Sequence, residues 1–273
     1  MPGWTWWPLS TWWHCTADTR PLDMGQYREL EPVPVLRPYL SCVWYQTVGP
    51  DEPGRVQRVL PDACIDIVWP AGGEPHVAGP DTGPVLAGLR PGSVLAGARF
   101  RPGRAPDFLG VAAHELRDEQ TDLAAVWGEA AARRLRESDA SGTGAVGAML
   151  DRLQDEVTAR LDRARDDGGP RAALAWARGR AALPRLGAEL GLGDRQLRRR
   201  VEERFGYGPA VLRRVLRLQR LLTLAARHRG GTLADLALAA GYADQAHMTR
   251  ECQRLAGLSP VRLLAEWLPT PPR

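Results

Sequence analysis

The chain has 273 residues, of which 44% are hydrophobic and 25% charged, so it is long enough for two domains that each bury a core. No apolar run reaches the roughly 20 residues that a membrane span needs. The start of the chain lacks the basic region and continuous apolar stretch of a signal peptide. These features argue against a membrane or secreted protein and predict a cytoplasmic one.

Charge is distributed unevenly along the chain, and all 36 basic residues are Arg. Residues 170–273 hold 19 Arg against 8 acidic residues, whereas residues 1–169 hold 17 Arg against 24. A basic region beside an acidic one is typical of a phosphate-binding domain attached to a domain of another kind. The four Cys are far apart and form no C-x-x-C pair, which predicts reduced thiols.

The first part of the chain is unusually aromatic. Residues 1–20 hold five of the ten Trp, and normal-looking sequence begins only near Met24. We therefore predict that residues 1–22 are a disordered extension, with an aromatic arm that contacts other surfaces as the alternative.

Residues 23–137 are predicted to form a β-rich domain that acts in sensing or dimerisation. Gly/Pro breakers separate short apolar stretches, a spacing that favours a sandwich or barrel. These stretches are Ser41–Val48, Arg55–Leu60, Cys64–Trp69 and Val94–Phe100. A short helix over Ala112–Glu119 and a longer one over Leu123–Arg136 are expected to follow.

Residues 138–169 are predicted to be a linker followed by an amphipathic helix. Residues 138–144 (SDASGTG) have linker composition, and apolar residues then recur every three or four positions over 145–164. This helix could pair with its copy in a homodimer, or it could pack on its own domain. The sequence leaves both open.

Residues 170–268 are predicted to form a helical domain that contains the same unit twice, with a tail over 269–273. The copies run from Leu186 to Pro209 and from Leu236 to Pro260. Equivalent residues lie 50 or 51 positions apart, as in Gly191 and Gly241, Leu197 and Met248, Arg199 and Arg250, and Gly206 and Gly257. Each copy has the pattern of a helix-turn-helix, whose second helix enters a DNA major groove.

The helices of this domain have recognisable ends. Thr232 and Asp235 are placed as a capping box, and Asp244 as an N-cap. Pro184 suits the first turn of a helix. We expect a lead helix over 171–181, recognition helices that begin at about 194 and 245, a connector over 209–227 buried on several sides, and a last helix over 260–267 that brings Trp267 into the core.

The connector determines how far apart the two units lie. It should span roughly 30 Å, and one turn of B-DNA is about 34 Å, so the two recognition helices could enter successive major grooves. This arrangement predicts a bipartite, non-palindromic site. Arg213, Arg214 and Arg217 on the connector are candidates for phosphate contacts.

The recognition helices carry the candidate DNA-binding residues. Apolar positions such as Leu197 and Met248 should face inward. Arg can bind guanine with two hydrogen bonds and Gln can do so with adenine, whereas His247 is better suited to a phosphate. The candidates that this leaves are Arg195, Gln196, Arg198, Arg199, Gln245, His247, Thr249 and Arg250.

The stretches RQLRRRVEERFGYGP and GYADQAHMTRECQRLAGLSP make residues 171–267 resemble the DNA-binding domain of the AraC/XylS family of transcription regulators. The resemblance implies seven helices, two helix-turn-helix units and binding to promoter DNA. By position it implies base contacts at Arg195, Arg198 and Arg199 and at Gln245, Ala246, Thr249 and Arg250. Departures from the family pattern are Val201 and Cys252 in place of Phe, and Gly193 in place of a Ser cap.

The N-terminal half resembles the corresponding domain of a subset of these regulators, whose ligand is undefined. The segments that carry this resemblance are LRPYLSCVWYQ, RVLPDACIDIVW, VAGPDT and GARFRPGRAPDFLGVAAHELRDE. By analogy it implies a cupin-like β-structure for a small-molecule effector or for dimerisation. Candidate pocket residues are the aromatic Trp44, Tyr45 and Trp69 and the charged Asp62, Asp66, Arg99 and Arg101.

The expected fold class is therefore α+β and multidomain, with an N-terminal β-rich domain that also has helices and a C-terminal all-α domain. We expect a bacterial transcription regulator rather than an enzyme, because the sequence has no nucleophile elbow, P-loop or His/Glu metal spacing. No catalytic residue, metal or cofactor is predicted. Expected partners are promoter DNA, a small-molecule effector, a second copy and, for an activator, RNA polymerase. The alternative is an N-terminal domain that only dimerises or binds protein.

Overall fold

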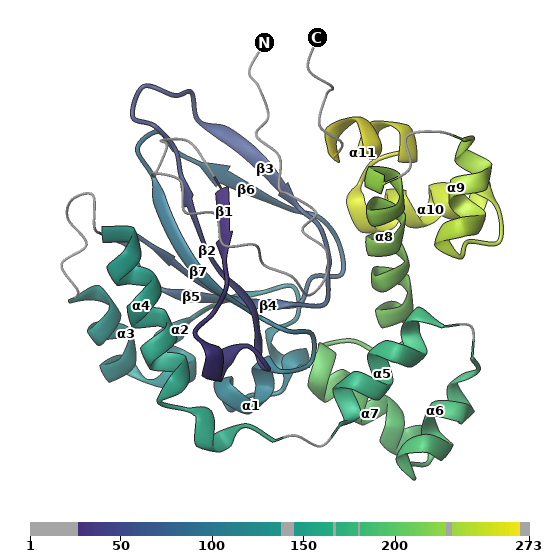
Figure 1. Cartoon of the computed structure of the whole chain (residues 1–273), viewed down its shortest axis with the longest axis horizontal. Coiled ribbons are helices and arrows are strands. Elements are labelled where there is room, and N and C mark those ends of the chain that lie inside the picture. The colour runs from purple at the N-terminus through teal and green to yellow at the C-terminus, as the bar shows by residue number, and fades with distance from the viewer. Residues whose placement is uncertain (1–26, 138–144, 166–167, 180, 228–230, 268–273) are drawn as a thin grey trace.

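The computed structural model describes residues 27–137, 145–165, 168–179, 181–227 and 231–267. They form a β-rich domain and an all-helical domain that lie side by side, so the predicted α+β multidomain class is confirmed (Figure 1). The predicted extension over 1–22, the linker over 138–144 and the tail over 269–273 lie outside the described residues.

The N-terminal domain contains a six-stranded antiparallel sheet and a two-stranded one. The order in the large sheet is β1-β2-β7-β4-β5-β8, and β3 pairs with β6 in the small sheet. Their bounds are Tyr27–Leu30 (β1), Leu40–Thr47 (β2), Arg55–Val59 (β3), Ile65–Pro70 (β4), His76–Ala78 (β5), Val85–Leu89 (β6), Val94–Phe100 (β7) and Gln120–Asp122 (β8).

Helices cover one face of the large sheet. They are η1 (Pro34–Leu36), α1 (Ala105–Leu109), η2 (Ala113–Leu116), α2 (Leu123–Trp127), α3 (Glu129–Arg136) and α4 (Ala145–Thr158), followed by η3 (Leu161–Arg163). The apolar side of α4, which includes Met149 and Leu153, packs with Ile67 and Ala98 of the sheet. Of the two possibilities for this helix, the structure has the one in which it packs on its own domain.

Three helix predictions for this region were wrong in extent. The single helix over Leu123–Arg136 is two helices, because Gly128 lies between them with φ 86° and ψ 155°. The helix predicted to reach residue 164 ends at Thr158, where the Arg160 guanidinium turns back to the carbonyl of Glu156 and lies 3.7 Å from the Trp127 ring centre. The helix over Ala112–Glu119 is the shorter η2.

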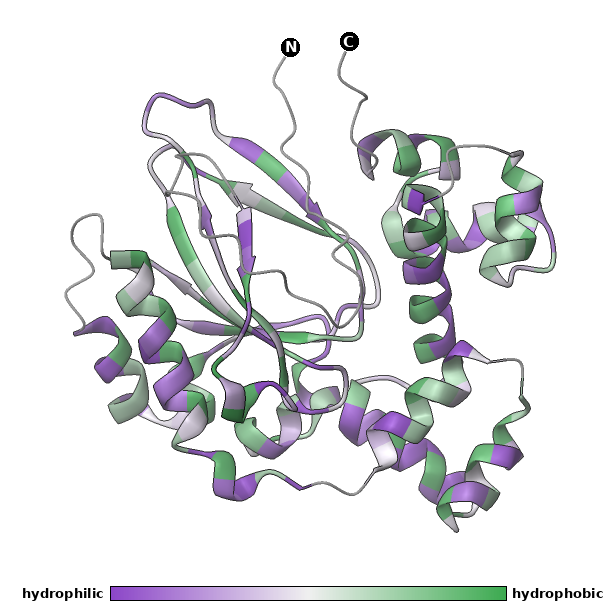
Figure 2. Ribbon diagram, viewed as in Figure 1, coloured by the Kyte–Doolittle hydropathy of each residue, from purple (hydrophilic) through white to green (hydrophobic). Residues whose placement is uncertain are grey.

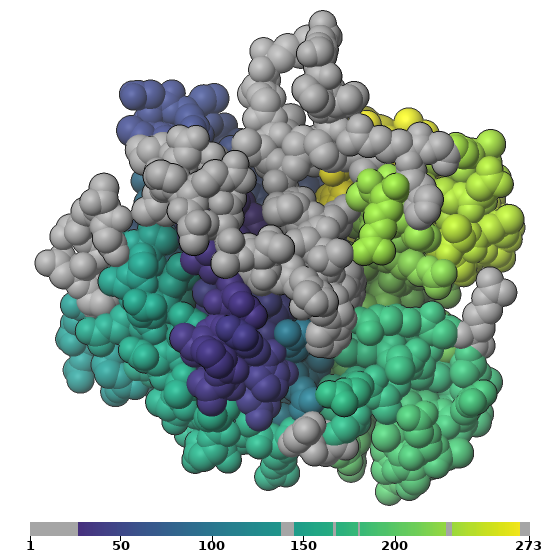
Figure 3. All heavy atoms as spheres, in the orientation of Figure 1, coloured from purple at the N-terminus to yellow at the C-terminus, as the bar shows by residue number. Residues whose placement is uncertain are grey.

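The C-terminal domain consists of helices packed around a second hydrophobic cluster. They are α5 (Gly169–Arg178), α6 (Leu183–Leu190), α7 (Asp194–Phe205), α8 (Pro209–Arg227), α9 (Leu233–Ala240), α10 (Gln245–Ala256) and α11 (Pro260–Trp267). The space-filling view shows the green α5–α7 region below the yellow-green α9–α11 region on the right of the molecule (Figure 3). The first copy of the repeated sequence corresponds to helices α6 and α7, and the second copy corresponds to α9 and α10. These two pairs of helices are the two helix-turn-helix units.

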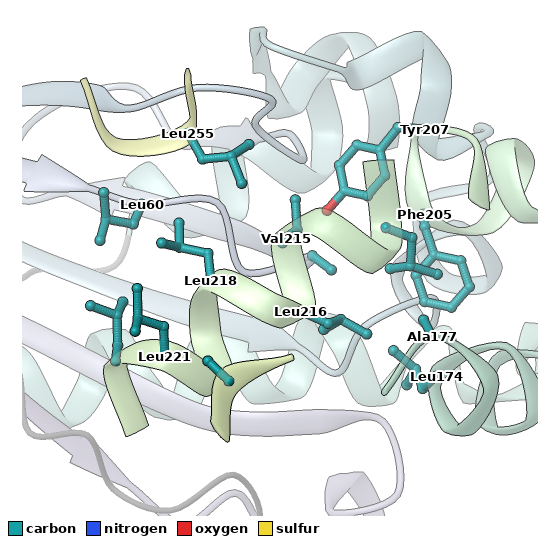
Figure 4. Packing of buried hydrophobic residues seen from close by; sticks show 14 of the residues in the cluster. Leu60, Leu174, Ala177, Phe205, Tyr207, Val215, Leu216, Leu218, Leu221 and Leu255 are labelled. Carbon is teal, nitrogen blue, oxygen red and sulfur yellow. The ribbon is translucent and has the colours of Figure 1, made fainter. Parts of the chain in front are cut away.

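The connector α8 is buried on several sides, as its apolar density predicts. Leu212, Leu218 and Leu221 are fully buried, and polar segments alternate with apolar ones along its ribbon (Figure 2). Leu60 of the N-terminal domain belongs to the same cluster and lies among Leu218, Leu221 and Leu255 (Figure 4). The two domains therefore share part of one hydrophobic core.

Candidate nucleic-acid interface

The first unit presents an Arg-rich helix to solvent. Leu197, Val201 and Phe205 of α7 are buried at three-to-four spacing, which directs the opposite side of the helix outward. Besides Asp194 at its start, the residues left exposed on its first two turns are Arg195, Gln196, Arg198, Arg199 and Arg200. Arg199 lies 3.4 Å from Glu203 in an exposed pair that DNA could displace at little cost, because such pairs contribute little in water.

The second unit has the same geometry with fewer charges. Met248, Cys252 and Leu255 of α10 are buried, whereas Gln245, Ala246, Thr249 and Arg250 are exposed. Both predicted caps are confirmed. The Thr232 hydroxyl accepts from the backbone N–H of Asp235 at 3.2 Å, and Asp244 accepts from that of His247 at 2.6 Å.

The unit boundaries follow from local chemistry. Gly191 and Gly241 each end the first helix of a unit in the left-handed conformation, which glycine adopts without the strain of a Cβ. Gly206 and Gly257 end the two recognition helices in the same way. The α8 helix joins the units with 19 residues, a length of about 28 Å at 1.5 Å per residue.

Two of the predicted DNA-binding residues have roles within their own units. His247 is half-buried, its Nδ1 accepts from the backbone N–H of Ala243 at 3.3 Å, and its ring packs edge-on against Tyr242. Through these contacts His247 stabilises the turn of the second unit, and its side chain is only partly exposed to solvent. Gln196 is exposed, and its Oε1 accepts from the N–H of Gly193 at 3.4 Å, so it also acts as a capping residue.

The connector Arg residues have contacts within the helical domain, and their predicted phosphate contacts stay a prediction. Arg213 donates to the carbonyl of Ala181 and lies 3.9 Å from the Trp176 ring centre. Arg214 lies 3.5 Å from the buried Glu251. Arg217 lies 3.4 Å from His247 Nε2. All three are half-buried and hold the helical domain together, which sequence reasoning missed because their partners are distant in the chain.

Other exposed Arg residues lie farther along the two recognition helices and were not singled out from the sequence. Arg200 lies one turn beyond Gln196 on α7, and Arg254 lies one turn beyond Arg250 on α10. The helical spacing relative to Leu197 and Met248 could have indicated both.

The first unit also packs against the N-terminal domain. Arg204 near the end of α7 donates to Asp107 of α1 at 2.7 Å, and both side chains are largely buried. Arg117 donates to the carbonyl of Gly206 at 3.3 Å. Gly206 lies so close to Pro80 that an added Cβ would be 2.3 Å from the proline Cγ.

The connector and the second unit make further contacts with the same domain. Gln219 of α8 donates to the carbonyl of Pro61 at 2.7 Å. Arg58 of β3 donates to the carbonyl of Ala256 at 3.1 Å and pairs with Glu266 of α11 at 3.3 Å. The N-terminal domain therefore contacts both units and the helix between them.

The predicted aromatic pocket of the N-terminal domain is divided by the sheet. Tyr45 and Trp69 lie in the core on the helix-covered face, whereas Trp44 belongs to a separate cluster with Tyr27 and Val68. The three aromatic residues therefore do not line one cavity. This follows from the alternation of side chains along β2, where neighbours point to opposite faces.

Two of the four polar pocket candidates are brought together beside Trp44. Arg99 donates to both oxygens of Asp66, and the Trp44 indole N–H donates to Asp66 at 3.1 Å. Burial raises the pKa of Asp66 above its ordinary range, although the Arg99 guanidinium acts in the opposite direction. Asp62 instead caps the backbone N–H of Cys64, and Arg101 donates to the carbonyl of Arg37.

Gly97 makes the polar cluster possible. A Cβ at this position would lie 2.2 Å from the Trp44 ring, so only glycine lets the indole lie across β7 toward Asp66. The three side chains Trp44, Asp66 and Arg99 form an aromatic and charged group, which we call the Trp44 cluster.

These two helix-turn-helix units on one connector define a DNA-binding protein with two recognition helices in a single chain. Residues 186–266 match a family described as a helix-turn-helix domain, and residues 28–122 match a domain of unknown function, DUF6597. Residues 186–266 therefore form an AraC-type helix-turn-helix domain.

Comparison with solved structures finds ToxT from Vibrio cholerae. One ToxT structure has 9% sequence identity and a TM-score of 0.42, and the match covers 82% of this chain and 98% of that one. A second, of ToxT bound to (E)-4-(8-methylnaphthalen-1-yl)but-3-enoic acid, has 10% identity and a TM-score of 0.43, over 81% of this chain and 98% of that one. No curated protein matches the chain. Within the described residues, none of the helices has the length and apolar character to cross a membrane.

Proposed function

We propose that this protein is a bacterial transcription regulator that reads a bipartite DNA site with α7 and α10 in successive major grooves. The observation that carries the proposal is the pair of equivalent exposed helices, each ending in a left-handed glycine and joined by one buried 19-residue helix. A rigid connector of this length supports a separation of about one DNA turn.

Base recognition is assigned to the exposed polar residues of the two helices. In α7 these are Arg195, Gln196, Arg198 and Arg199, and in α10 they are Gln245, Thr249 and Arg250. Because α7 carries several Arg, its half-site should be rich in guanine, whereas Gln245 suits adenine. His247 is assigned to positioning the turn that precedes α10, in view of its contacts within the unit.

The experiment is selection of bound fragments from a random DNA pool with the full chain, followed by the same selection with Arg199→Ala and Arg250→Ala. We expect a bipartite motif with half-site centres about one helical turn apart. Each variant should lose preference in one half only, at a cost of roughly 1–3 kcal/mol at the affected base pair.

A matched control is Arg220→Ala, which removes an exposed Arg from α8 outside both recognition helices. It should leave both halves of the motif intact. If the wild-type chain selects no motif at moderate salt, or if each substitution weakens both halves equally, the proposal of two independent reading helices is wrong.

Control by a small molecule is the proposed role of the N-terminal domain, with the Trp44 cluster, an indole beside a charged pair, as the group that would contact the ligand. The remaining proposals are a cytoplasmic location, a homodimer and, for an activator, contact with RNA polymerase. A screen of small molecules for a rise in melting temperature tests the effector, since a ligand that binds only the folded state stabilises it. Arg99→Gln should abolish any such rise; a domain that only dimerises would give no rise with any compound.

A further inference from the structure

A groove of about 950 Å³ runs between the first recognition helix and the N-terminal domain. One wall is α7, and the other is formed by α1, the turn that follows it, and η3 with the residues after it. The α7 wall carries Gln196, Arg200 and Glu203, which lie at three-to-four spacing along one side of the helix. Arg199 lines the groove as well, so the groove opens onto the face assigned to base recognition.

The charged residues that line this groove have a net positive charge, with five Arg against three acidic residues. Arg204 and Asp107 lie within it and neutralise each other at 2.7 Å, and Arg199 lies 3.4 Å from Glu203. When these two pairs are set aside, the charged residues of the described lining are Arg163, Arg165 and Arg200 with Asp162. The groove is therefore suited to an anionic occupant.

The far wall is held firmly in place. The Arg104 guanidinium donates to the carbonyl of Arg165 at 3.1 Å, and Arg104 is itself buried at the start of α1. The backbone N–H of Arg163 bonds to the carbonyl of Arg160 at 3.0 Å. The side chains of Arg163 and Arg165 are exposed on this anchored backbone.

A helix in the major groove has a sugar–phosphate strand along each side, because the groove is about 12 Å wide and a helix nearly fills it. When α7 reads bases through Arg195 and Arg199, one strand must follow the side that carries Gln196 and Arg200. That side is the α7 wall of the groove.

We propose that this groove receives the DNA strand beside the first half-site and that Arg163 and Arg165 of the N-terminal domain contact its phosphates. The inference rests on the proposed function, since it requires α7 to enter the major groove. It adds to that function a part of the interface outside the helix-turn-helix domain. The first half-site would then be bound by both domains.

The test uses the full chain with Arg163 and Arg165 both changed to Ala, and a duplex selected by the wild type. Binding is measured over about 50–200 mM salt, where each lost phosphate contact lowers the slope of log K against log salt by about 0.9. We expect affinity to fall about tenfold on any sequence, with a slope smaller by about 2. In ethylation interference, modification of two phosphates beside the first half-site should weaken binding of the wild type but not of this variant.

The matched control is Arg90→Ala with Arg152→Ala, which removes the same charge from exposed positions outside the groove. It should leave the salt slope and the interference pattern unchanged. Arg163→Lys with Arg165→Lys keeps both charges and should retain the slope, and melting curves confirm that each variant is folded.

Two results would overturn the inference while the proposed function stands. In one, the Ala variant binds the selected duplex with the slope of the control. In the other, it binds more tightly, which would mean that this wall hinders DNA. If the wild type shows no sequence preference at all, the proposed function fails first and this inference fails with it.

Discussion

The two helix-turn-helix units have the same lengths and the same glycine ends, but they are stabilised in different ways. In each, an 8-residue helix precedes a 12-residue recognition helix. The second unit is capped by its own side chains, through Thr232, Asp235 and Asp244. The first begins its helices at Ala182 and Gly193, and neither residue provides a side-chain cap.

The first unit instead has extensive contacts with the N-terminal domain. Phe205 would be within 3.0 Å of a Cβ at Gly103, and Gly206 and Arg204 pack against Pro80 and Asp107. The second unit contacts that domain through Arg58 and through Leu255, which shares a buried cluster with Leu60, but its recognition helix ends without a comparable overlap, since a Cβ at Gly257 would be 3.4 Å from Pro84. The comparison teaches that one motif can gain its stability from local hydrogen bonds or from tertiary packing, and that only the second way couples it to another domain.

The largest expected effect on stability comes from substituting Gly206, which ends the first recognition helix. Gly257, which ends the second, is the matched comparison. Gly206→Ala combines a left-handed backbone, with φ 82°, and an overlap with Pro80 at 2.3 Å, so we expect a loss of about 4 kcal/mol in the free energy of unfolding. Gly257→Ala has φ 70° but only an ordinary contact of 3.4 Å with Pro84, and should cost about 1 kcal/mol. Urea unfolding of the full chain measures both.

A double-mutant cycle with Pro80→Ala separates the two causes. Removing the proline Cγ should reduce the cost of Gly206→Ala toward that of Gly257→Ala, because the 2.3 Å overlap disappears and the closest remaining contact of the new Cβ is the Ala113 carbonyl oxygen at 3.1 Å. Equal costs for the two glycine substitutions in the wild-type background would show that the first unit does not depend on this packing.

The next effect concerns the ion pairs that link the domains. Arg204→Ala leaves Asp107, which is 7% exposed, without its cation, and should cost about 3 kcal/mol. Glu266→Ala breaks the more exposed pair with Arg58 beside the second unit, and should cost less than about 1 kcal/mol. Thermal unfolding at matched pH gives the difference, and a larger loss for Glu266→Ala would reverse the comparison.

Features determined by neighbouring residues could be predicted from the sequence. The bounds of α7 and α8, the Thr232 capping box and the Asp244 cap all agree with the structure, because each depends on residues within one or two turns. The exposed faces of the recognition helices follow from the same periodicity. The base contacts assigned to them stay predictions.

Features determined by distant residues could not be predicted. Strands β5 and β8 have three residues each, too few for a period to be visible, and they form because β5 pairs with β4 and β8 pairs with β5. The partners of Arg213 and Arg217 are Ala181 and His247, about 30 positions away. The groove beside α7 depends on contacts between α7 and α1, about 100 positions apart in the chain, which no local pattern encodes.

A smaller effect should appear in how the stability of the chain changes with pH, through a carboxyl group near the contact between the first unit and the N-terminal domain. Burial, and then the nearby carboxylates of Asp62 and Asp118, raise the pKa of Asp81 to about 7. Asp81 also acts electrostatically on Tyr207, the buried residue that follows Gly206. At pH values between the two pKa values, the Asp81 carboxyl is therefore protonated in the folded chain and ionised in the unfolded chain.

The sign follows from proton binding. Between the unfolded pKa of about 4 and the folded pKa of about 7, the folded state binds more protons, so its stability falls as pH rises through this window. Asp81→Asn should abolish this fall and raise the melting temperature most at pH of about 8, with a smaller rise at pH of about 5, which lies near the lower end of the window. An equal shift at both pH values would show that the carboxyl does not titrate in this range.

The smallest effects distinguish the caps. Thr232→Ala removes the hydroxyl that accepts from the N–H of Asp235, and should cost about 1 kcal/mol. Gly193→Ser should supply the first unit with the cap that it lacks, and replacing Gly by Ser at an N-cap gains only a few tenths of a kcal/mol. Opposite signs, measured by denaturant midpoints at unchanged slope, would confirm that the second unit depends on its own caps and that the first has an unfilled cap position. A loss on Gly193→Ser would mean that the N–H bond from Gly193 to Gln196 already serves the first unit as well as a side-chain cap would.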